Sequence, residues 1–144
     1  MRFVRLASLL VASSLTLAAC GTQSPASALK NWMTQSSVLA NLTTLVGDAH
    51  KVQTQLLDPR ATPGNLHLVC AVLYLDSNAA AAALPTPDSQ TSTLLSGAYE
   101  SLLRAVNGCY AATTSPARRL SAEADLHAAG ALIDEARARM VAAS

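Results

Sequence analysis

Apolar side chains recur at helical spacing along most of this chain. In the segments 25–57 and 116–142 they step alternately by four and three residues, which places them on one face of a helix. Similar patterns cover 63–84 and 88–113, and no alternating pattern typical of a β-strand reaches useful length. The sequence therefore predicts an all-α fold, in which these four helices pack as an antiparallel four-helix bundle with short loops.

The apolar faces of these helices predict the core. The second helix differs from the others because its first half, 66–75, is apolar nearly all round, so we expect it to be the most buried element. The predicted face of 25–57 is Val38, Leu42, Leu45, Ala49, Val52 and Leu56, widened by Leu39 and Val46. That of 88–113 is Leu95, Ala98, Leu102, Val106 and Cys109, and that of 116–142 is Ala122, Leu126, Ala129, Ile133, Ala136 and Met140.

Four Ser-Pro or Thr-Pro dipeptides mark the expected helix starts. The hydroxyl can cap a free backbone N–H, and proline suits the first turn because its missing donor has no partner there. These dipeptides are Ser24-Pro25, Thr62-Pro63, Thr86-Pro87 and Ser115-Pro116.

The N-terminus has the pattern of an export signal. Arg2 and Arg5 precede an apolar run over 6–18, which is shorter than the roughly 20 residues of a spanning helix. The run ends in Leu17-Ala18-Ala19-Cys20, which resembles the lipobox of bacterial lipoproteins. The alternative is an ordinary secretion signal in which the cysteine is incidental.

The lipobox resemblance implies a compartment and an anchor. In that family the cysteine thiol receives a diacylglyceryl group, with acyl chains of the palmitate type, and a peptidase cuts just before it. Residues 1–19 would then be a signal peptide, 20–24 a lipidated tether and 25–144 the helical bundle. We expect the chain to be held by Cys20 on the extracytoplasmic face of the cell membrane, where two acyl chains give stable anchoring.

The two remaining cysteines are expected to pair. With Cys20 lipidated, Cys70 and Cys109 would lie outside the cytoplasm, where disulfides persist. The alternative is two buried free thiols. A tight turn between the second and third helices would leave the two sulfurs out of register. Either an extended segment over 84–87 or a late start of the third helix, near Ser92, would bring them level.

A second resemblance covers about residues 62–142. The segment Cys70 to Leu73, the turn Leu84-Pro85-Thr86-Pro87-Asp88 and the pair Cys109-Tyr110 look like small exported helical proteins common in actinobacteria. The resemblance implies an all-helical fold with a disulfide, and it carries over no catalytic residue.

Candidate chemistry is sparse. Glu123, His127 and Asp134 share one helix face and could hold a metal ion, but a solvated face that pairs with Arg119 and Arg137 explains them as well. We expect no metal, no cofactor and no catalytic residue. His50 and His67 are interpreted as packed or rim residues. For Trp32 two uses are open, core packing or contact with the bilayer interface.

Composition narrows the function classes. The 144 residues are 51% hydrophobic and 13% charged, with a net charge of +1, which is too balanced for a nucleic-acid-binding face. The sequence shows no pairing of a general acid, a general base or a nucleophile of the kind that enzymes use, so we do not expect an enzyme. Two hypotheses follow. The first is a membrane-anchored structural or interaction module of the cell envelope, which predicts an exposed apolar patch. The second is a module that binds a small apolar ligand or lipid, which predicts a cavity of several hundred Å³.

Overall fold

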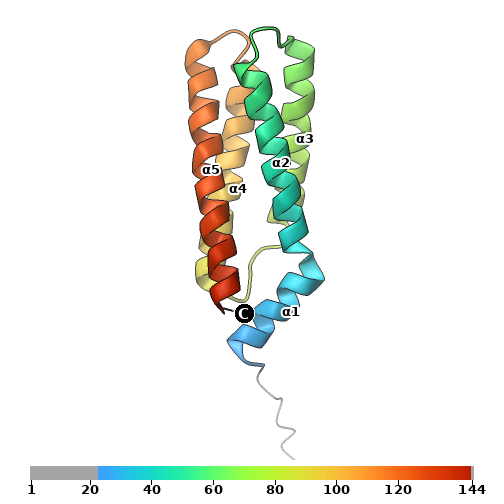
Figure 1. Ribbon diagram of the computed structural model, residues 1–144, viewed down its shortest axis with the longest axis vertical. Helices are drawn as coiled ribbons and strands as arrows, with labels where there is room; N and C mark the ends of the chain where they lie inside the picture. The colour runs from blue at the N-terminus through green and yellow to red at the C-terminus, as the bar shows by residue number, and fades with distance from the viewer. Residues whose placement is uncertain (1–22, 144) are drawn as a thin grey trace, which may run out of the picture.

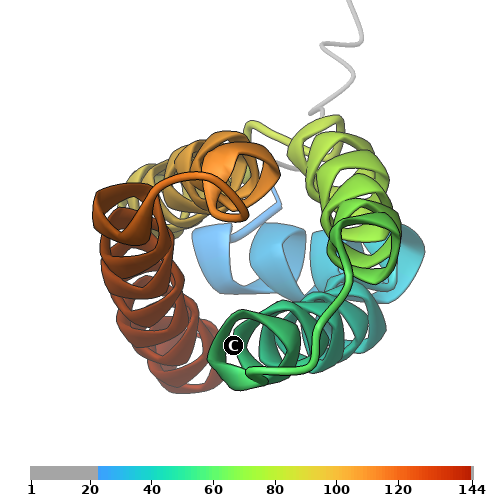
Figure 2. The same ribbon diagram turned by 90° about the horizontal axis from the view of Figure 1, so that it is seen from above.

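The computed structural model describes residues 23–143, which form five α-helices and no strand. The predicted all-helical class is confirmed, but the expected number of four helices is wrong. Helices α2 to α5 stand side by side and α1 lies across one end (Figure 1); from above, the four long helices surround a common centre (Figure 2). The bounds are Pro25–Ser36 for α1, Val38–Leu57 for α2, Pro63–Ala81 for α3, Ser89–Ala111 for α4 and Pro116–Ala143 for α5.

The extra helix comes from a break at Ser37. The segment 25–57, expected as one helix, separates there because Ser37 adopts a left-handed conformation, with φ of 50° and ψ of 30°. Such a residue cannot continue a right-handed helix. The adjoining Ser36 hydroxyl donates to the carbonyl of Trp32, and the Asn41 side chain donates to the carbonyl of Ser36. The second bond satisfies the Ser36 carbonyl, which has no intrahelical partner at the end of α1.

The break at Ser37 leaves α2, with 20 residues, close in length to α3, with 19 residues. At 1.5 Å per residue, a helix over 25–57 would reach about 50 Å, whereas α3 beside it spans about 28 Å. The bend folds α1 over the end of the core instead. Leu29 is buried there, and Trp32 packs against the core while its Nε1 donates to the carbonyl of Ala83 at 3.2 Å. Of the two uses open for Trp32, the structure shows core packing.

The helix starts agree with the Ser-Pro and Thr-Pro signals at three of four places. Ser24 and Thr62 accept hydrogen bonds from the first turns of α1 and α3, and Ser115 accepts one from the Arg118 N–H. The expected cap at Thr86 is wrong, because Asp88 caps α4 by accepting from the Thr91 N–H. A carboxylate is a stronger acceptor than a hydroxyl, and it adds favourable charge at a helix N-terminus.

The predicted faces of α4 and α5 are confirmed as core. All eleven residues predicted on them are buried, and these two helices make the most extensive pairing in the described part of the chain. Gly108 permits their close approach, because a Cβ there would lie 3.1 Å from the Ala122 Cβ and 3.2 Å from the Arg118 carbonyl oxygen. Glycine and alanine thus take the place of bulky side chains at this contact.

The expectations for α2 and α3 need correction. Leu39 and Val46 do not widen the buried face of α2, and Ala49 on that face is only partly buried. Helix α3 is not the most deeply buried element. Its inner face holds Leu66, Cys70, Leu73, Ser77 and Ala80. Only one face of α3 packs against the other helices, so its remaining apolar side chains face outward.

Cys70 and Cys109 form a disulfide between α3 and α4, as expected from the sequence. Their Cα atoms are 6.3 Å apart, within the range that disulfides span. Helix α3 ends at Ala81 rather than near 84, and residues 82–88 link it to α4. The register is therefore set by this linker, and the alternative start of α4 near Ser92 is wrong.

We expect the disulfide to contribute strongly to stability. It closes a loop with a sequence separation of 39 residues, and the chain-entropy model gives about 4 kcal/mol for a loop of that size. The double variant Cys70→Ala/Cys109→Ala should lose roughly this free energy of unfolding in urea titrations. Adding a reductant should lower the stability of the natural chain and leave that of the variant unchanged. Equal stability of the two proteins without reductant would contradict the role assigned to the disulfide.

Candidate functional site

The outward face of α3 is the most apolar exposed surface of a single helix in the described residues. Leu68 and Leu75 are 67% and 65% exposed, and Val72 between them is 39% exposed. With the exposed Ala79, these four residues step by 4, 3 and 4, so they form one continuous stripe along the helix, which we call the α3 stripe. Single exposed leucines are ordinary, but a continuous stripe of them marks an interaction surface.

The α3 stripe also lacks charge. All residues of α3 are described, and Asp76 is the only Asp, Glu, Lys or Arg among them. Asp76 is half-buried and lies near Asp48 of α2, which raises the pKa of the Asp76 carboxyl. Loss of charged residues at the centre is typical of protein–protein interfaces.

Two carboxyl groups, those of Asp48 and Asp76, lie close together between α2 and α3. Asp48 is buried, its Oδ1 accepts from Lys51 Nζ at 2.7 Å, and its Oδ2 has no hydrogen-bond partner within the described residues. The Asp48 carboxyl, together with burial, raises the pKa of Asp76, because each disfavours the ionised form of Asp76. The hydrogen bond to Asp48 also raises the pKa of Lys51.

Aromatic rings border the α3 stripe on the side of α4. The rings of His67 and Tyr110 meet edge to face with centroids 5.3 Å apart, and Tyr74 is 46% exposed. His67, interpreted from the sequence as a packed or rim residue, lies on the exposed part of α3. Tyrosine at the border of an apolar surface is common in interfaces because it combines apolar area with a hydroxyl.

A groove separates α2 from α5. It has a volume of about 450 Å³, with Leu102, Leu126 and Ile133 among its apolar lining and His50, Gln53, His127 and Asp134 as its polar lining. The Gln53 Nε2 and His127 Nε2 atoms lie 3.4 Å apart across it. A Cβ placed on Gly130 would meet nothing within 4 Å, so the missing side chain leaves part of this space open.

The structure does not bring together the three residues that were considered from the sequence as possible metal ligands, Glu123, His127 and Asp134. His127 and Asp134 line the groove, Glu123 is not part of its lining, and Arg137 lies 3.9 Å from Asp134. Among residues 23–143 no three His, Cys, Asp or Glu side chains lie close enough together to hold a metal ion. The sequence reasoning missed that His50 joins His127 in the groove, because no local pattern tells which of the other helices lies beside α5.

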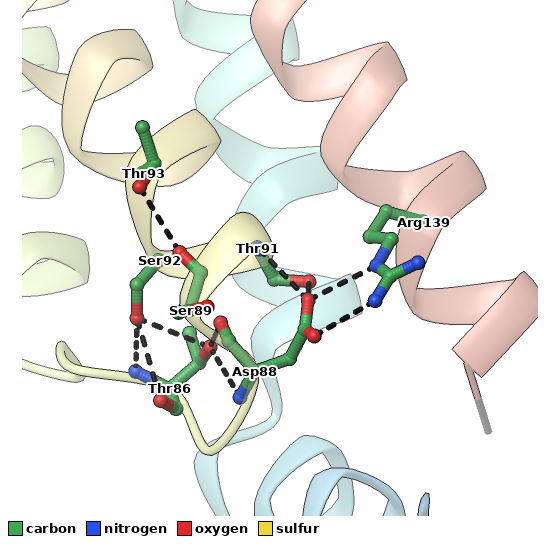
Figure 3. A network of polar contacts seen from close by, with 7 residues as sticks. All are labelled: Thr86, Asp88, Ser89, Thr91, Ser92, Thr93 and Arg139. Atoms are coloured by element: carbon green, nitrogen blue, oxygen red, sulfur yellow. Dashed lines mark hydrogen bonds and ion pairs between the residues drawn. The ribbon is translucent and has the colours of Figure 1, made fainter.

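A cluster of polar side chains joins the C-terminal end of α5 to the N-terminal end of α4. The guanidinium of Arg139 donates to both carboxylate oxygens of Asp88, at 3.0 and 3.1 Å (Figure 3). The Thr91 N–H and hydroxyl donate to the same carboxylate, and Thr86 donates to the Asp88 carbonyl. Ser92 accepts from the Thr86 N–H. The turn Pro85-Thr86-Pro87-Asp88 thus connects the start of α4 to Arg139 of α5, and we call this set of polar contacts the clasp.

The clasp makes the folded state sensitive to acid. Hydrogen bonds from Arg139 and Thr91 hold the pKa of Asp88 well below its usual range. A carboxyl with a lowered pKa in the folded state stabilises that state above its unfolded pKa of about 3.9, and this contribution is lost as the pH falls through the folded value. The stabilisation is therefore present at neutral pH and disappears only in strong acid.

We expect Asp88→Asn to flatten this acid dependence. Asparagine caps a helix about as well as aspartate, but it cannot pair with Arg139 as an anion. Urea midpoints measured between about pH 5 and pH 2 should fall less for the variant than for the natural chain. Asp134→Asn is the matched control, since that carboxylate is 78% exposed and its pair with Arg137 is long. An equally steep fall for Asp88→Asn and the natural chain would contradict the assignment.

The remaining predicted site residue, Cys20, lies outside the described residues. No described helix is long and apolar enough to cross a membrane. No protein-family model matches the chain, and comparisons with curated proteins and with solved structures find no match.

Proposed function

We propose that this chain is a lipoprotein, held by diacylglyceryl-Cys20 on the extracytoplasmic face of the cell membrane, that acts as an interaction module of the cell envelope. The α3 stripe is the observation that carries the interaction role. The Leu17-Ala18-Ala19-Cys20 motif and the basic start supply the argument for the anchor. The disulfide is compatible with this compartment.

The stripe supports docking rather than chemistry. It presents leucine and valine side chains along an α-helix, and its four residues include no nucleophile or charged group. Leu68 and Leu75 are about two-thirds exposed, so covering them would contribute about 1–2 kcal/mol each, two-thirds of the value for a fully buried leucine. A partner that supplies an apolar face of its own therefore fits this surface.

The tether sets which end of the molecule is nearest the membrane. In this proposal α2 to α5 form an antiparallel four-helix bundle, and α1 lies at the end next to the tether. Only residues 21–24 separate Cys20 from Pro25, and these four residues span about 14 Å at most. The bundle would therefore stand with the α1 end toward the bilayer and with the α3 stripe running away from it.

A second candidate function is favoured by the groove between α2 and α5. Its volume of about 450 Å³ lies within the range of small-molecule sites, and an apolar floor with a few polar groups is their usual lining. Leu102, Leu126 and Ile133 would contact an apolar ligand, while His50 and His127 would bind a polar end. In this reading the chain holds a small apolar molecule or lipid.

The anchor can be tested by lipid labelling. Cells that express the full chain are grown with labelled palmitate, and we expect the purified protein to carry label on a chain that begins at Cys20. Cys20→Ala should abolish the label, because the thiol is the atom that takes the lipid. The control Cys70→Ala keeps Cys20 and should be labelled. Absence of label from the natural chain would contradict the lipoprotein assignment.

The interaction role can be tested by native mass spectrometry of protein purified from its own envelope. We expect the natural chain to carry a bound polypeptide, of its own or another sequence, and Leu68→Glu/Leu75→Glu to be free of it because the charges would be desolvated. The control Ala124→Glu/Ala128→Glu changes two exposed positions of α5 and should keep the partner. A bound lipid in place of a polypeptide would support the groove instead, and an unliganded monomer in all three samples would contradict both functions.

A further inference from the structure

The groove between α2 and α5 lies where the long helices are packed least closely. Of the neighbouring pairs among α2 to α5, these two helices make the least extensive pairing, so the groove opens between them. Its apolar lining includes Leu102 of α4 with Leu126 and Ile133 of α5, and all three side chains are buried in the core. A molecule that lies in the groove would therefore contact core side chains directly.

Two contacts fix the register of α2 against α5. The Gln53 Nε2 atom of α2 lies 3.4 Å from Nε2 of His127 on α5. Earlier on α2, the Thr43 hydroxyl accepts from Arg137 Nη2 at 3.4 Å. Because the residue number falls along α5 as it rises along α2, the two helices run in opposite directions. The groove therefore has Gln53 and His127 at one end and Asp134 at the other, about 10 Å away along α5.

The end of the groove at Gln53 and His127 presents hydrogen-bond donors. The 3.4 Å between the two nitrogen atoms exceeds the roughly 2.7–3.2 Å of an ordinary N–H hydrogen bond, so these groups satisfy each other poorly. A glutamine amide has two N–H donors, and an imidazole has at least one. His50, one turn before Gln53, adds a second imidazole to the lining. Donors at this spacing can bond together to one carboxylate, whose oxygens only accept.

The charges around the groove favour a carboxylate at this end and a chain without charge at the other. Asp134 carries the only carboxylate of the described lining, it is 78% exposed, and Arg137 lies 3.9 Å from it. Repulsion between like charges places the carboxylate of a ligand away from Asp134. The described lining contains no Lys or Arg, the side chains that usually hold phosphate groups. A carboxylate therefore fits this groove better than the head group of a phospholipid.

From these contacts we infer that the groove binds a fatty acid, with its carboxylate at Gln53 and His127 and its acyl chain over Leu102 and Ile133 toward Val46. The inference rests on the second candidate function and names its ligand class. A groove between two neighbouring helices is narrow, so it takes one acyl chain rather than two. Val46 is 38% exposed without a ligand and would be covered by the chain. Each CH₂ group that leaves water strengthens binding about fourfold.

Gly130 gives a means of closing the groove while the fold is kept. It lines the groove, level with His50, and a Cβ there would meet nothing within 4 Å. Gly130→Leu should therefore fill space that the acyl chain needs. Gly47→Leu is the matched control, because Gly47 also lies inside a helix with nothing within 4 Å of a Cβ, but does not line the groove. Leucine favours a helix over glycine, so neither variant should lower the urea midpoint.

The site can be tested by photolabelling in membranes of cells that express the full chain. The probe is dodecanoic acid with a photoreactive group at its methyl end. We expect label on the natural chain, placed by peptide mass near Val46 or Ile133. Gly47→Leu should be labelled equally, whereas Gly130→Leu should lose label at least about tenfold, since several CH₂ groups are excluded. Equal labelling of the two leucine variants would overturn the inference.

The acid group can be tested by competition with unlabelled compounds. Dodecanol has the same chain without a carboxylate, and it should need about a tenfold higher concentration than dodecanoic acid to displace the probe. His127→Phe keeps a ring in place but removes its N–H, so this variant should lose most of that preference. The control His67→Phe changes an exposed histidine of α3 outside the groove and should keep the preference.

The outcomes separate the ligand class from the second candidate function. Equal displacement of the probe by dodecanoic acid and dodecanol would overturn the fatty acid and leave the groove as a site for an uncharged apolar molecule. Absence of label from the natural chain would overturn both the fatty acid and the ligand-binding function.

Discussion

The Cys70–Cys109 disulfide is the constraint on which the arrangement of α3 depends. The first half of α3, 66–75, is apolar nearly all round, so burial of apolar area alone gives little preference for one side over another there. The disulfide removes that freedom, because it requires the side of α3 that carries Cys70 to face α4. Once this rotation is set, Leu66 and Leu73 are buried, and Leu68 and Leu75 have no position left except the surface.

The polar groups of the bundle reinforce the same arrangement. The Asp88–Arg139 pair fixes α4 against α5, and Asp76, the one charged residue of α3, lies near Asp48 of α2. The exposed stripe of α3 itself contains no charged residue, and this apolar surface is the basis of the proposed interaction role.

The faces of α4 and α5 could be predicted from the sequence, whereas the exposed face of α3 could not. Glu123, Asp125 and His127 lie between Ala122, Leu126 and Ala129, so the spacing identifies one buried side without knowledge of the neighbours. No such contrast exists over 66–75, where Leu66 and Leu68 differ in burial but not in character. The groove between α2 and α5 could not be predicted either, because His50 and His127 are 77 positions apart and come together only when these two helices pack side by side.

Local chemistry in the sequence was sufficient for the helix starts at Pro25, Pro63 and Pro116, for the all-helical class and for the pairing of two cysteines. These features depend on residues close in the chain or on the number of thiols available. The break at Ser37 and the outward stripe on α3 were decided by tertiary structure, because they satisfy conditions set by another helix: the length of a neighbour, and the rotation that a disulfide imposes. The cap at Asp88 is local, since Asp88 accepts from Thr91 three residues on, and its pairing with Arg139 of α5 is the part that tertiary structure added.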